Sequence, residues 1–297
     1  MAGDWDGSVM LRVLDGESVI EMSLGEYLLG VVRAEMPATF GQEALKAQAV
    51  AARTYTMYKL QSGGNHGDTA HICTDHTCCQ AYSPKEQAWA NWGENAAEYE
   101  EKIETAVRET DGETILYGGE PILAVFHASS AGQTRAAGEV WLNDLPYLQA
   151  VSSPEEGEAI PNYYSRVEFA ADTFKEKMLA ACPEANLSGV PSAWLKNAVT
   201  DSAGSVKTVE VGGVAMKGTA VRTALGLRSA CFEWEVEGDT LVFFVTGHGH
   251  GVGMSQYGAN AMAEAGADYR DILTHYYTGV SVEVWEGLNS FTNRAEA

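Results

Sequence analysis

The sequence has little positive charge and no long apolar run. It carries 19 lysines and arginines against 41 acidic residues, a formal net charge of −22. Such a chain is repelled by nucleic acid and by anionic membrane surfaces, which excludes nucleic acid as a partner. No stretch reaches the roughly 18 apolar residues of a membrane span, and the opening MAGDWDGSVM has no signal-peptide character. We therefore expect either a cytosolic protein or one with a membrane anchor ahead of Met1.

Cysteine is scarce, and most of it is clustered. Three of the five cysteines fall in one short stretch that also contains histidines, whereas Cys182 and Cys231 stand apart and are expected to be buried and free. A tight cluster of this kind indicates a metal site before a disulfide framework, and thiolate-rich sites with four ligands suit Zn²⁺. Redox-active or incidental thiols are the alternative. The candidate ligands are His66, His71, Cys73, His76, Cys78 and Cys79.

Nothing in this stretch marks the zinc as catalytic. A catalytic zinc keeps an open ligand position and usually has a glutamate nearby, as in His-Glu-x-x-His, and that motif is missing from the sequence. The cluster is therefore interpreted as a structural clamp on a polar loop. A zinc hydrolase remains a rival hypothesis, which four protein ligands would exclude and three ligands plus water would support.

Local signals predict the secondary structure of the first half. Alternation over 9–22 around Asp15-Gly16 predicts a β-hairpin. Ser23-Leu24-Gly25-Glu26 is a capping box that starts a helix, and Pro37 ends it at Met36. The other expected elements are a helix over 42–60, an irregular stretch over 64–84, an acidic helix over 94–109, and two strands around 117–119, the second ending at His127.

The second half alternates between helices and strands, with no internal repeat. After a surface excursion over 131–165 we expect helices near 171–181 and 218–226, strands over 232–236 and 239–245, a helix from Ser255 and a closing helix over 269–277. This order is typical of an α+β protein. The sequence predicts a single catalytic domain over 1–297, with a possible inserted lobe at about 150–235.

Glu35 is the first candidate for chemistry. It lies in an apolar stretch at a predicted helix end, where a carboxyl group loses solvation and its protonated form is favoured. A general acid needs this property at neutral pH. Lys46 and Arg53 are seven residues apart on the next helix and should point the same way, with small alanines between them. The alternatives are a solvent-facing glutamate and an ordinary solvated stripe.

The motif GHGHGVGMSQYGA places five glycines around two histidines, ahead of a helix N-terminus. It lacks the Lys-Ser/Thr pair of a phosphate loop. His250, Ser255 and Gln256 could hydrogen-bond a polar ligand such as a sugar, and His127, at the end of an apolar strand, is a similar case. Tight turns and buried core histidines are the competing interpretation.

Together these motifs resemble the stage II sporulation protein D lytic transglycosylases and their relatives, the amidase enhancers. The similarity covers nearly the whole chain and rests on SLGEYLLGVVRAEMPATFGQEALKAQAVAARTY, FHASSAGQT, VWLNDLPYL and GHGHGVGMSQYGANAMAEAG. The resemblance implies an enzyme that cuts peptidoglycan glycan strands, preferably stripped of stem peptides, at the MurNAc-GlcNAc bond to leave 1,6-anhydro ends. It implies action during forespore engulfment, beside an amidase and other engulfment proteins, at the extracytoplasmic face of an anchoring membrane.

The resemblance also assigns roles to residues. It implies that Glu35 is the catalytic acid and then base, that Zn²⁺ is structural, and that the alternative function is a glycan-binding amidase enhancer without catalysis. The substrate-binding residues it implies are Lys46, Arg53, His127, His250, Ser255 and Gln256. The metal ligands it implies are His66, Cys73, Cys78 and Cys79, with His71 and His76 as alternative histidines.

Overall fold

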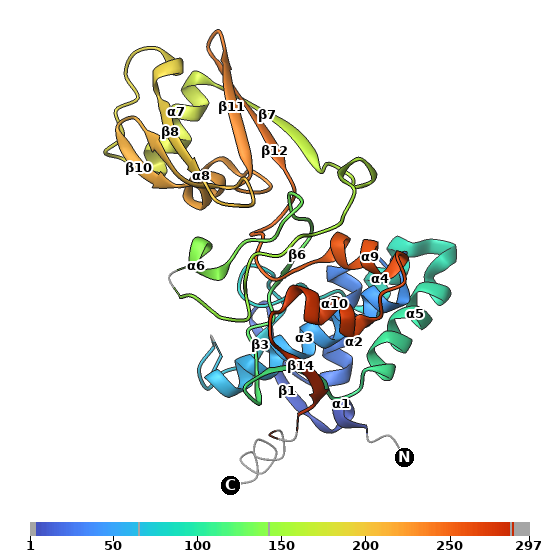
Figure 1. Cartoon of the computed structure of the whole chain (residues 1–297). Coiled ribbons are helices and arrows are strands. Elements are labelled where there is room, and N and C mark those ends of the chain that lie inside the picture. Colours follow the sequence, from blue (N-terminus) through green and yellow to red (C-terminus); the bar gives the residue numbers. More distant parts are fainter. Residues whose placement is uncertain (1–3, 65, 142, 286, 288–297) are drawn as a thin grey trace. The chain divides into compact units, whose positions relative to one another are not determined.

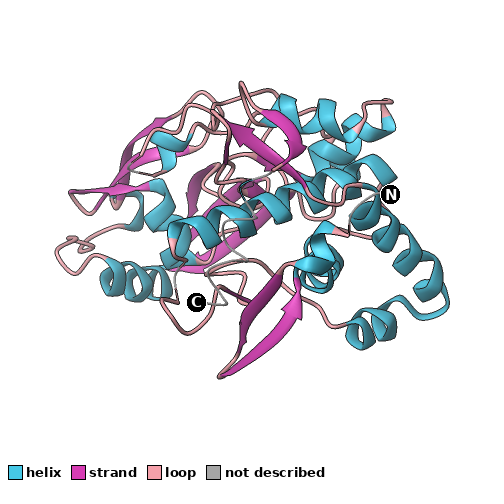
Figure 2. Ribbon diagram, turned by 90° about the horizontal axis from the view of Figure 1, so that it is seen from below, coloured by secondary structure: helices cyan, strands magenta, loops and turns pink. Residues whose placement is uncertain are grey.

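The chain divides into two compact units, the second inserted into the first. The computed structural model describes residues 4–64, 66–141, 143–285 and 287. Met1–Val125 and Met262–Ala297 make up one unit and Phe126–Ala261 the other, so the insertion is wider than the lobe predicted at about 150–235 (Figure 1). The mixture of helices and strands confirms the α+β class (Figure 2). Among the described helices, none has the length and apolarity to cross a bilayer.

The first unit begins as its local signals predict. After α1 (Trp5–Ser8), strands β1 (Met10–Asp15) and β2 (Ser18–Ser23) form the hairpin, and α2 (Leu24–Glu35) follows. Ser23 and Glu26 make both hydrogen bonds of the capping box. Met36 leaves the helix with φ −127° and ψ 134°, the extended geometry that Pro37 imposes on the residue before it. The predicted ends of this helix are confirmed, and Glu35 is its last residue.

Helix α3 (Gln42–Ser62) is the central helix of this unit. It packs against α2, α5 (Ala96–Glu109), α10 (Tyr269–Tyr276) and β4 (Glu113–Tyr117). Its alanines between positions 47 and 52 are fully buried, and their small size lets these neighbours approach. The helix ends at Gly63, whose φ of 82° is the left-handed geometry of a helix C-terminus. The remaining elements of the unit include α4 (Lys85–Trp92), β3 (Ile72–Cys73), β5 (Glu120–Pro121) and β14 (Ser281–Val284). The sequence did not predict α4, β3 or β14.

The second unit has a hydrophobic core of its own. Six of its described strands form the antiparallel sheets β11–β12–β7 and β10–β9–β8, over which α7 (Ala171–Ala181) and α8 (Gly218–Leu225) pack. Buried aromatic rings fill the centre, where Phe174 stacks on Trp194 with centroids 5.9 Å apart. The strands are β7 (Tyr164–Ala170), β8 (Leu195–Thr200), β9 (Val206–Val211), β10 (Val214–Lys217), β11 (Phe232–Glu237) and β12 (Thr240–Thr246).

Two predictions in the middle of the chain are wrong. The strand expected to run to His127 is split into β5 and the separate β6 (Phe126–His127), and β6 pairs in parallel with β13 (Met254–Ser255). The stretch 131–165 is not a surface excursion. Thr134 and Leu148 within it are fully buried, around the short helix α6 (Ala137–Val140). Both segments belong to the second unit, where β6 and β13 bring His127 into register with Ser255.

Candidate functional site

Glu35 is a partly exposed carboxylate held in place by a loop. Its Oε1 accepts a hydrogen bond of 2.7 Å from the backbone N–H of Ala81. Ala81 comes two residues after Cys79, at the end of the Cys/His-rich segment 66–82. The orientation of this carboxylate therefore depends on where that segment lies.

The Cys/His-rich segment is anchored to the first unit mainly by backbone contacts. Strand β3 pairs in parallel with β1, so that Cys73 lies beside Leu14. The hydroxyl of Tyr27 donates to the carbonyl of Cys73 at 3.0 Å, and that of Tyr55 donates to the carbonyl of Cys78 at 3.4 Å. Because Tyr27 is on α2 and Tyr55 on α3, the segment is fixed to both helices that precede it.

Four side chains of this segment form a group that fits a tetrahedral metal ion. The ligand atoms of His66, Cys73, Cys78 and Cys79 all lie within 4.8 Å of one another. His66 Nε2 is 3.6 Å from each of the Cys78 and Cys79 sulfurs, which are 3.8 Å apart. A tetrahedral zinc with usual bond lengths separates two sulfurs by about 3.8 Å and a sulfur and a nitrogen by about 3.5 Å. The donor set and its spacing thus suit Zn²⁺.

The competing histidines are placed elsewhere. His71 Nδ1 accepts a hydrogen bond of 3.1 Å from the Arg12 backbone N–H, and His76 is exposed with Nδ1 3.9 Å from an Asp75 carboxylate oxygen. Within the described residues, His66 is therefore the histidine of the cluster. Burial raises the pKa of the Cys73 thiol and raises that of Cys79 to about 12. A divalent cation reverses such a shift because it stabilises the thiolates that bind it.

Gly30 provides the space in which the end of this segment lies against α2. A Cβ at Gly30 would lie 2.0 Å from the ring of Tyr82, which stacks on Tyr27 with centroids 5.9 Å apart. The backbone N–H of Ser83 donates to the Gly30 carbonyl at 2.9 Å. Glycine at this position lets Tyr82, the residue after Ala81, approach the helix backbone.

Replacing Gly30 by Ala is therefore expected to destabilise the protein by about 1–3 kcal/mol, although Ala is the better helix former. The orientation of Glu35 should change with it, because the displaced Tyr82 carries the neighbouring Ala81 N–H away. Gly25→Ala in the same helix is the matched control, since its Cβ would meet only Asp6 at 3.5 Å. Urea unfolding of both variants checks this, and equal stability of the two would contradict the packing argument.

Lys46 and Arg53 lie on the same side of α3, as their spacing predicts, but that side faces α5. Lys46 Nζ is 2.9 Å from a carboxylate oxygen of Glu43 and 2.9 Å from one of Glu109. Burial opposes the charge of Lys46, but these two carboxylates raise its pKa overall. The lysine is thus already neutralised by acidic partners within its own unit.

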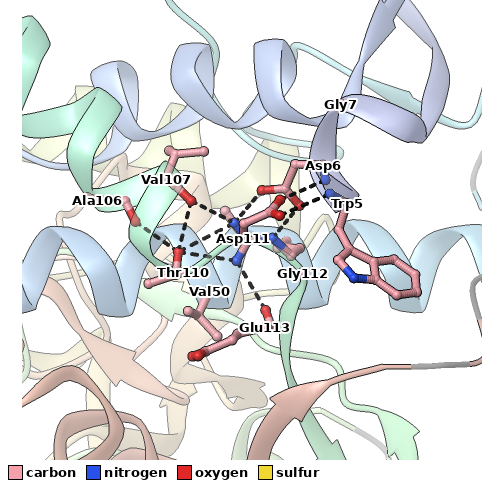
Figure 3. A network of polar contacts seen from close by, with 12 residues as sticks. Trp5, Asp6, Gly7, Val50, Ala106, Val107, Thr110, Asp111, Gly112 and Glu113 are labelled. Carbon is pink, nitrogen blue, oxygen red and sulfur yellow. Dashed lines mark hydrogen bonds and ion pairs between the residues drawn. The ribbon is translucent and has the colours of Figure 1, made fainter. Parts of the chain in front are cut away.

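Arg53 is a buried residue with partners inside the first unit, so its expected substrate role stays a prediction that the structure does not favour. Its side chain is 1% exposed. Its Nε and Nη2 donate to the two carboxylate oxygens of Asp6 at 2.7 and 2.6 Å, and Nη1 donates to the Glu113 carbonyl at 3.1 Å. Asp111 in turn accepts from the backbone N–H of Trp5 and Asp6 (Figure 3). Arg53 therefore fastens the N-terminal turn to the core.

Arg53→Ala is expected to cost about 3–5 kcal/mol of stability, because it leaves the Asp6 carboxylate buried and unpaired. Arg53→Lys should recover only part of this, since an ammonium cannot make the bidentate pair. The exposed Arg108→Ala is the control, expected to stay within about 0.5 kcal/mol. Urea denaturation measures the effect. A variant of normal stability that binds glycan poorly would instead support the substrate role.

The second unit brings its predicted residues together in a buried polar network. His127 is 4% exposed, and its Nδ1 donates to the Val252 carbonyl at 3.2 Å while its Nε2 accepts from the Ser130 hydroxyl at 2.7 Å. Ser255 Oγ donates to Glu155 Oε1 at 2.7 Å, and the Ser130 backbone N–H donates to the same oxygen at 2.6 Å. Neither Ser130, although it lies in the motif FHASSAGQT, nor Glu155 was among the predicted site residues, because both lie in segments without regular structure.

This network changes the roles expected of several residues. Ser255 is fully buried and its hydroxyl is already used inside the unit, so it organises the glycine turn instead of facing a ligand. Gln256 is buried as well. Burial lowers the pKa of His127, and the nearby His250 lowers it further. His127 is therefore a neutral, internally bonded histidine at physiological pH.

His250 is the partly exposed member of the group. Its ring lies 5.5 Å from the rings of both His127 and Trp141, centroid to centroid, and its Nδ1 accepts from the Val252 backbone N–H at 3.1 Å. Burial, and then the charge of Arg222, lower its pKa to about 4. His250 thus presents an uncharged ring beside an exposed indole.

Known proteins resemble this chain over most of its length. The family model described as stage II sporulation protein matches residues 15–117. Stage II sporulation protein D of Bacillus amyloliquefaciens is 38% identical over 276 residues, 93% of this chain and 78% of that protein. The protein of the same name from Bacillus subtilis (strain 168) is 39% identical over 267 residues, 90% of this chain and 76% of that protein.

A relative with another name is also similar. The amidase enhancer of Bacillus subtilis (strain 168) is 31% identical over 303 residues, 86% of this chain but 40% of that longer protein. The two sporulation proteins are matched over more than three quarters of their own length. The chain therefore belongs to the stage II sporulation protein D family.

Proposed function

We propose that this protein is a peptidoglycan lytic transglycosylase in which Glu35 is the catalytic acid and base. The observation that carries the proposal is the placement of Glu35, a partly exposed carboxylate at a helix end, oriented by the Ala81 N–H at 2.7 Å. That hydrogen bond fixes the orientation of the carboxyl group at the helix end. A carboxyl group in this setting can protonate the glycosidic oxygen of a bound strand.

One carboxylate is sufficient for the reaction proposed. Most glycosidases need a second carboxylate, to activate water or to attack the sugar. In a lytic transglycosylase the muramic acid 6-hydroxyl attacks its own anomeric carbon instead. Glu35, ionised after protonating the leaving oxygen, takes the proton of that hydroxyl as the 1,6-anhydro ring closes.

We propose a structural Zn²⁺ bound by His66, Cys73, Cys78 and Cys79. Four protein donors complete a tetrahedral shell and leave no position for a reacting water, which argues against the zinc hydrolase alternative. When bound, the ion supplies folding free energy to a polar segment. The residues of that segment then hold Ala81, and through it Glu35.

The setting of the reaction is inferred from the relatives. The names of the matched proteins associate the family with sporulation and with an amidase. We propose that the protein works at the extracytoplasmic face of the membrane in a spore-forming bacterium, on strands from which an amidase has removed the stem peptides. The runner-up function, enhancement of that amidase by glycan binding alone, rests on the amidase enhancer relative.

A direct experiment separates the two functions. Purified protein is incubated with stripped glycan strands, and the products are examined by mass spectrometry for 1,6-anhydro-MurNAc ends. The proposal predicts new anhydro ends that accumulate with time and with enzyme concentration. Strands that are bound but uncut, together with faster turnover by an added amidase, would support the enhancer function and overturn the proposal.

A further inference from the structure

A small cavity in the second unit contains an arginine with an unused donor. The cavity has a volume of about 20 Å³, enough for one or two water-sized atoms. Ser130, Arg135, Ser205, Ser229 and His250 are among the residues that line it. The hydroxyls and the guanidinium make part of its wall polar, while the rest of the wall is apolar.

Arg135 is the unusual member of this wall. Its side chain is 3% exposed, and its Nε donates to Asp201 Oδ2 at 2.6 Å. Its Nη1 is buried and has no hydrogen-bond partner among the described residues. A buried donor on a charged group is costly to leave unsatisfied. An arginine fork also has the geometry that best matches a carboxylate.

Arg135 lines the cavity, and two further arginines lie near its lining residues. Burial, and then the charge of Arg135, lower the pKa of Arg222. Arg228 lies next to the cavity residue Ser229, and its Nε is buried without a partner. Acidic residues lie here as well: Asp201 pairs with Arg135, the Glu155 carboxylate accepts from the Ser130 N–H, and the charge of Glu233 acts on the cavity residue Cys231.

The histidines near these arginines add no positive charge of their own, because burial lowers the pKa of both His248 and His250. Burial and then Arg228 lower the pKa of His248, whose Nδ1 is 3.1 Å from Arg228 Nη2. Burial and then the charge of Arg222 lower the pKa of His250, so its ring is uncharged as well. Arg135 is therefore the cation that this cavity offers, in a space too small for anything larger than a compact polar group.

An exposed aromatic ring lies beside the cavity. The Trp141 indole, 36% exposed, contacts the His250 ring, which lines the cavity. Such a ring offers an apolar face to a sugar, while nearby polar groups can fix the sugar's substituents. A glycan that lies over Trp141 would have its substituents near the cavity mouth.

We propose that this cavity binds the free lactyl carboxylate of a muramic acid residue, with Arg135 Nη1 as its donor. The inference rests on the proposed function and names the group by which the substrate is recognised. While a stem peptide is attached, the lactyl group ends in a neutral amide with a chain behind it, which has neither the charge nor the size that the cavity fits. Removal of the peptide creates the anion. Arg135 is thereby a specificity residue for stripped strands.

The test compares two matched glycans. Stripped strands are used as such or after their lactyl carboxylates have been converted to primary carboxamides. The KM of the wild-type protein for carboxylate strands should be lower than its KM for carboxamide strands by about tenfold or more, at similar kcat. Arg135→Gln should raise the KM for carboxylate strands to that for carboxamide strands. Equal KM values in the wild-type protein, or discrimination that survives in the variant, would overturn the inference.

Two further arms allow for a variant that fails to fold. Ser205→Val keeps the Arg135–Asp201 pair but fills the cavity, and it should also lose the discrimination. Without any substitution, D-lactate should raise the melting temperature of the wild-type protein, whereas the neutral D-lactamide should not. No difference between the two small molecules counts against the cavity. If the wild-type protein cuts neither strand while D-lactate stabilises it, the proposed function fails and the carboxylate site stands.

Discussion

Glu35→Gln is expected to lower the rate of strand cleavage by roughly 10²–10⁴-fold, the range that a positioned acid or base contributes. The amide cannot protonate the leaving oxygen or accept the proton of the 6-hydroxyl. Its own oxygen can still accept the Ala81 N–H, so the loop should stay in place. Stability and glycan binding should therefore change little. Single-turnover assays on stripped strands, with binding measured separately, check both statements.

Glu101→Gln is the control, because it removes the same negative charge from an exposed residue of α5. It should leave the rate unchanged. Substantial turnover by the Glu35 variant would mean that another group performs the acid step. A large fall in melting temperature would mean that Glu35 acts through the fold of the loop instead.

The second large effect is expected from loss of the metal. Chelation, or Cys79→Ser, should lower the melting temperature and reduce cleavage at least tenfold, although no cluster residue is proposed to touch the substrate. Structural zinc contributes folding free energy directly. Cys79 is two residues from Ala81, so a released segment also removes the hydrogen bond that orients Glu35. Metal content, melting temperature and cleavage rate are measured on the same samples.

Cys182→Ala is the matched control, because Cys182 is a free cysteine of the second unit and lies outside the cluster. It should keep one zinc per chain and should lose stability only through the small buried side chain. If protein purified without chelators contains far less than one zinc per chain, the proposed clamp is incorrect. Full activity after complete metal removal would mean that the metal cluster is not needed to orient Glu35.

Local signals in the sequence were sufficient for most helix ends. The Ser23 cap, Pro37 and Gly63 fix where α2 and α3 begin or end, because each acts through its own backbone geometry or its nearest neighbours. The choice of His66 among the three candidate histidines, which the resemblance implied, agrees with the cluster in the structure.

Roles that depend on distant partners could not be predicted. The spacing of Lys46 and Arg53 is typical of a solvated stripe on a helix. Arg53 can be buried because it pairs with Asp6, which is 47 residues earlier in the chain. The bonds of Ser255 likewise depend on Glu155, 100 residues away in a segment without periodicity. No pattern within either motif contains this information, since a buried ion pair or network is created by tertiary packing alone.

The insertion of one unit into the other has a consequence for the order of folding. Helix α10 packs on α3, the Tyr269 backbone N–H donates to Glu43 at 3.0 Å, and Tyr276 and Tyr277 are fully buried. The first unit therefore lacks part of its core until residues beyond 262 have left the ribosome, whereas Phe126–Ala261 is by then complete. We expect the inserted unit to fold first during synthesis, and the unit that carries Glu35 to close last, around contacts of the longest sequence separation.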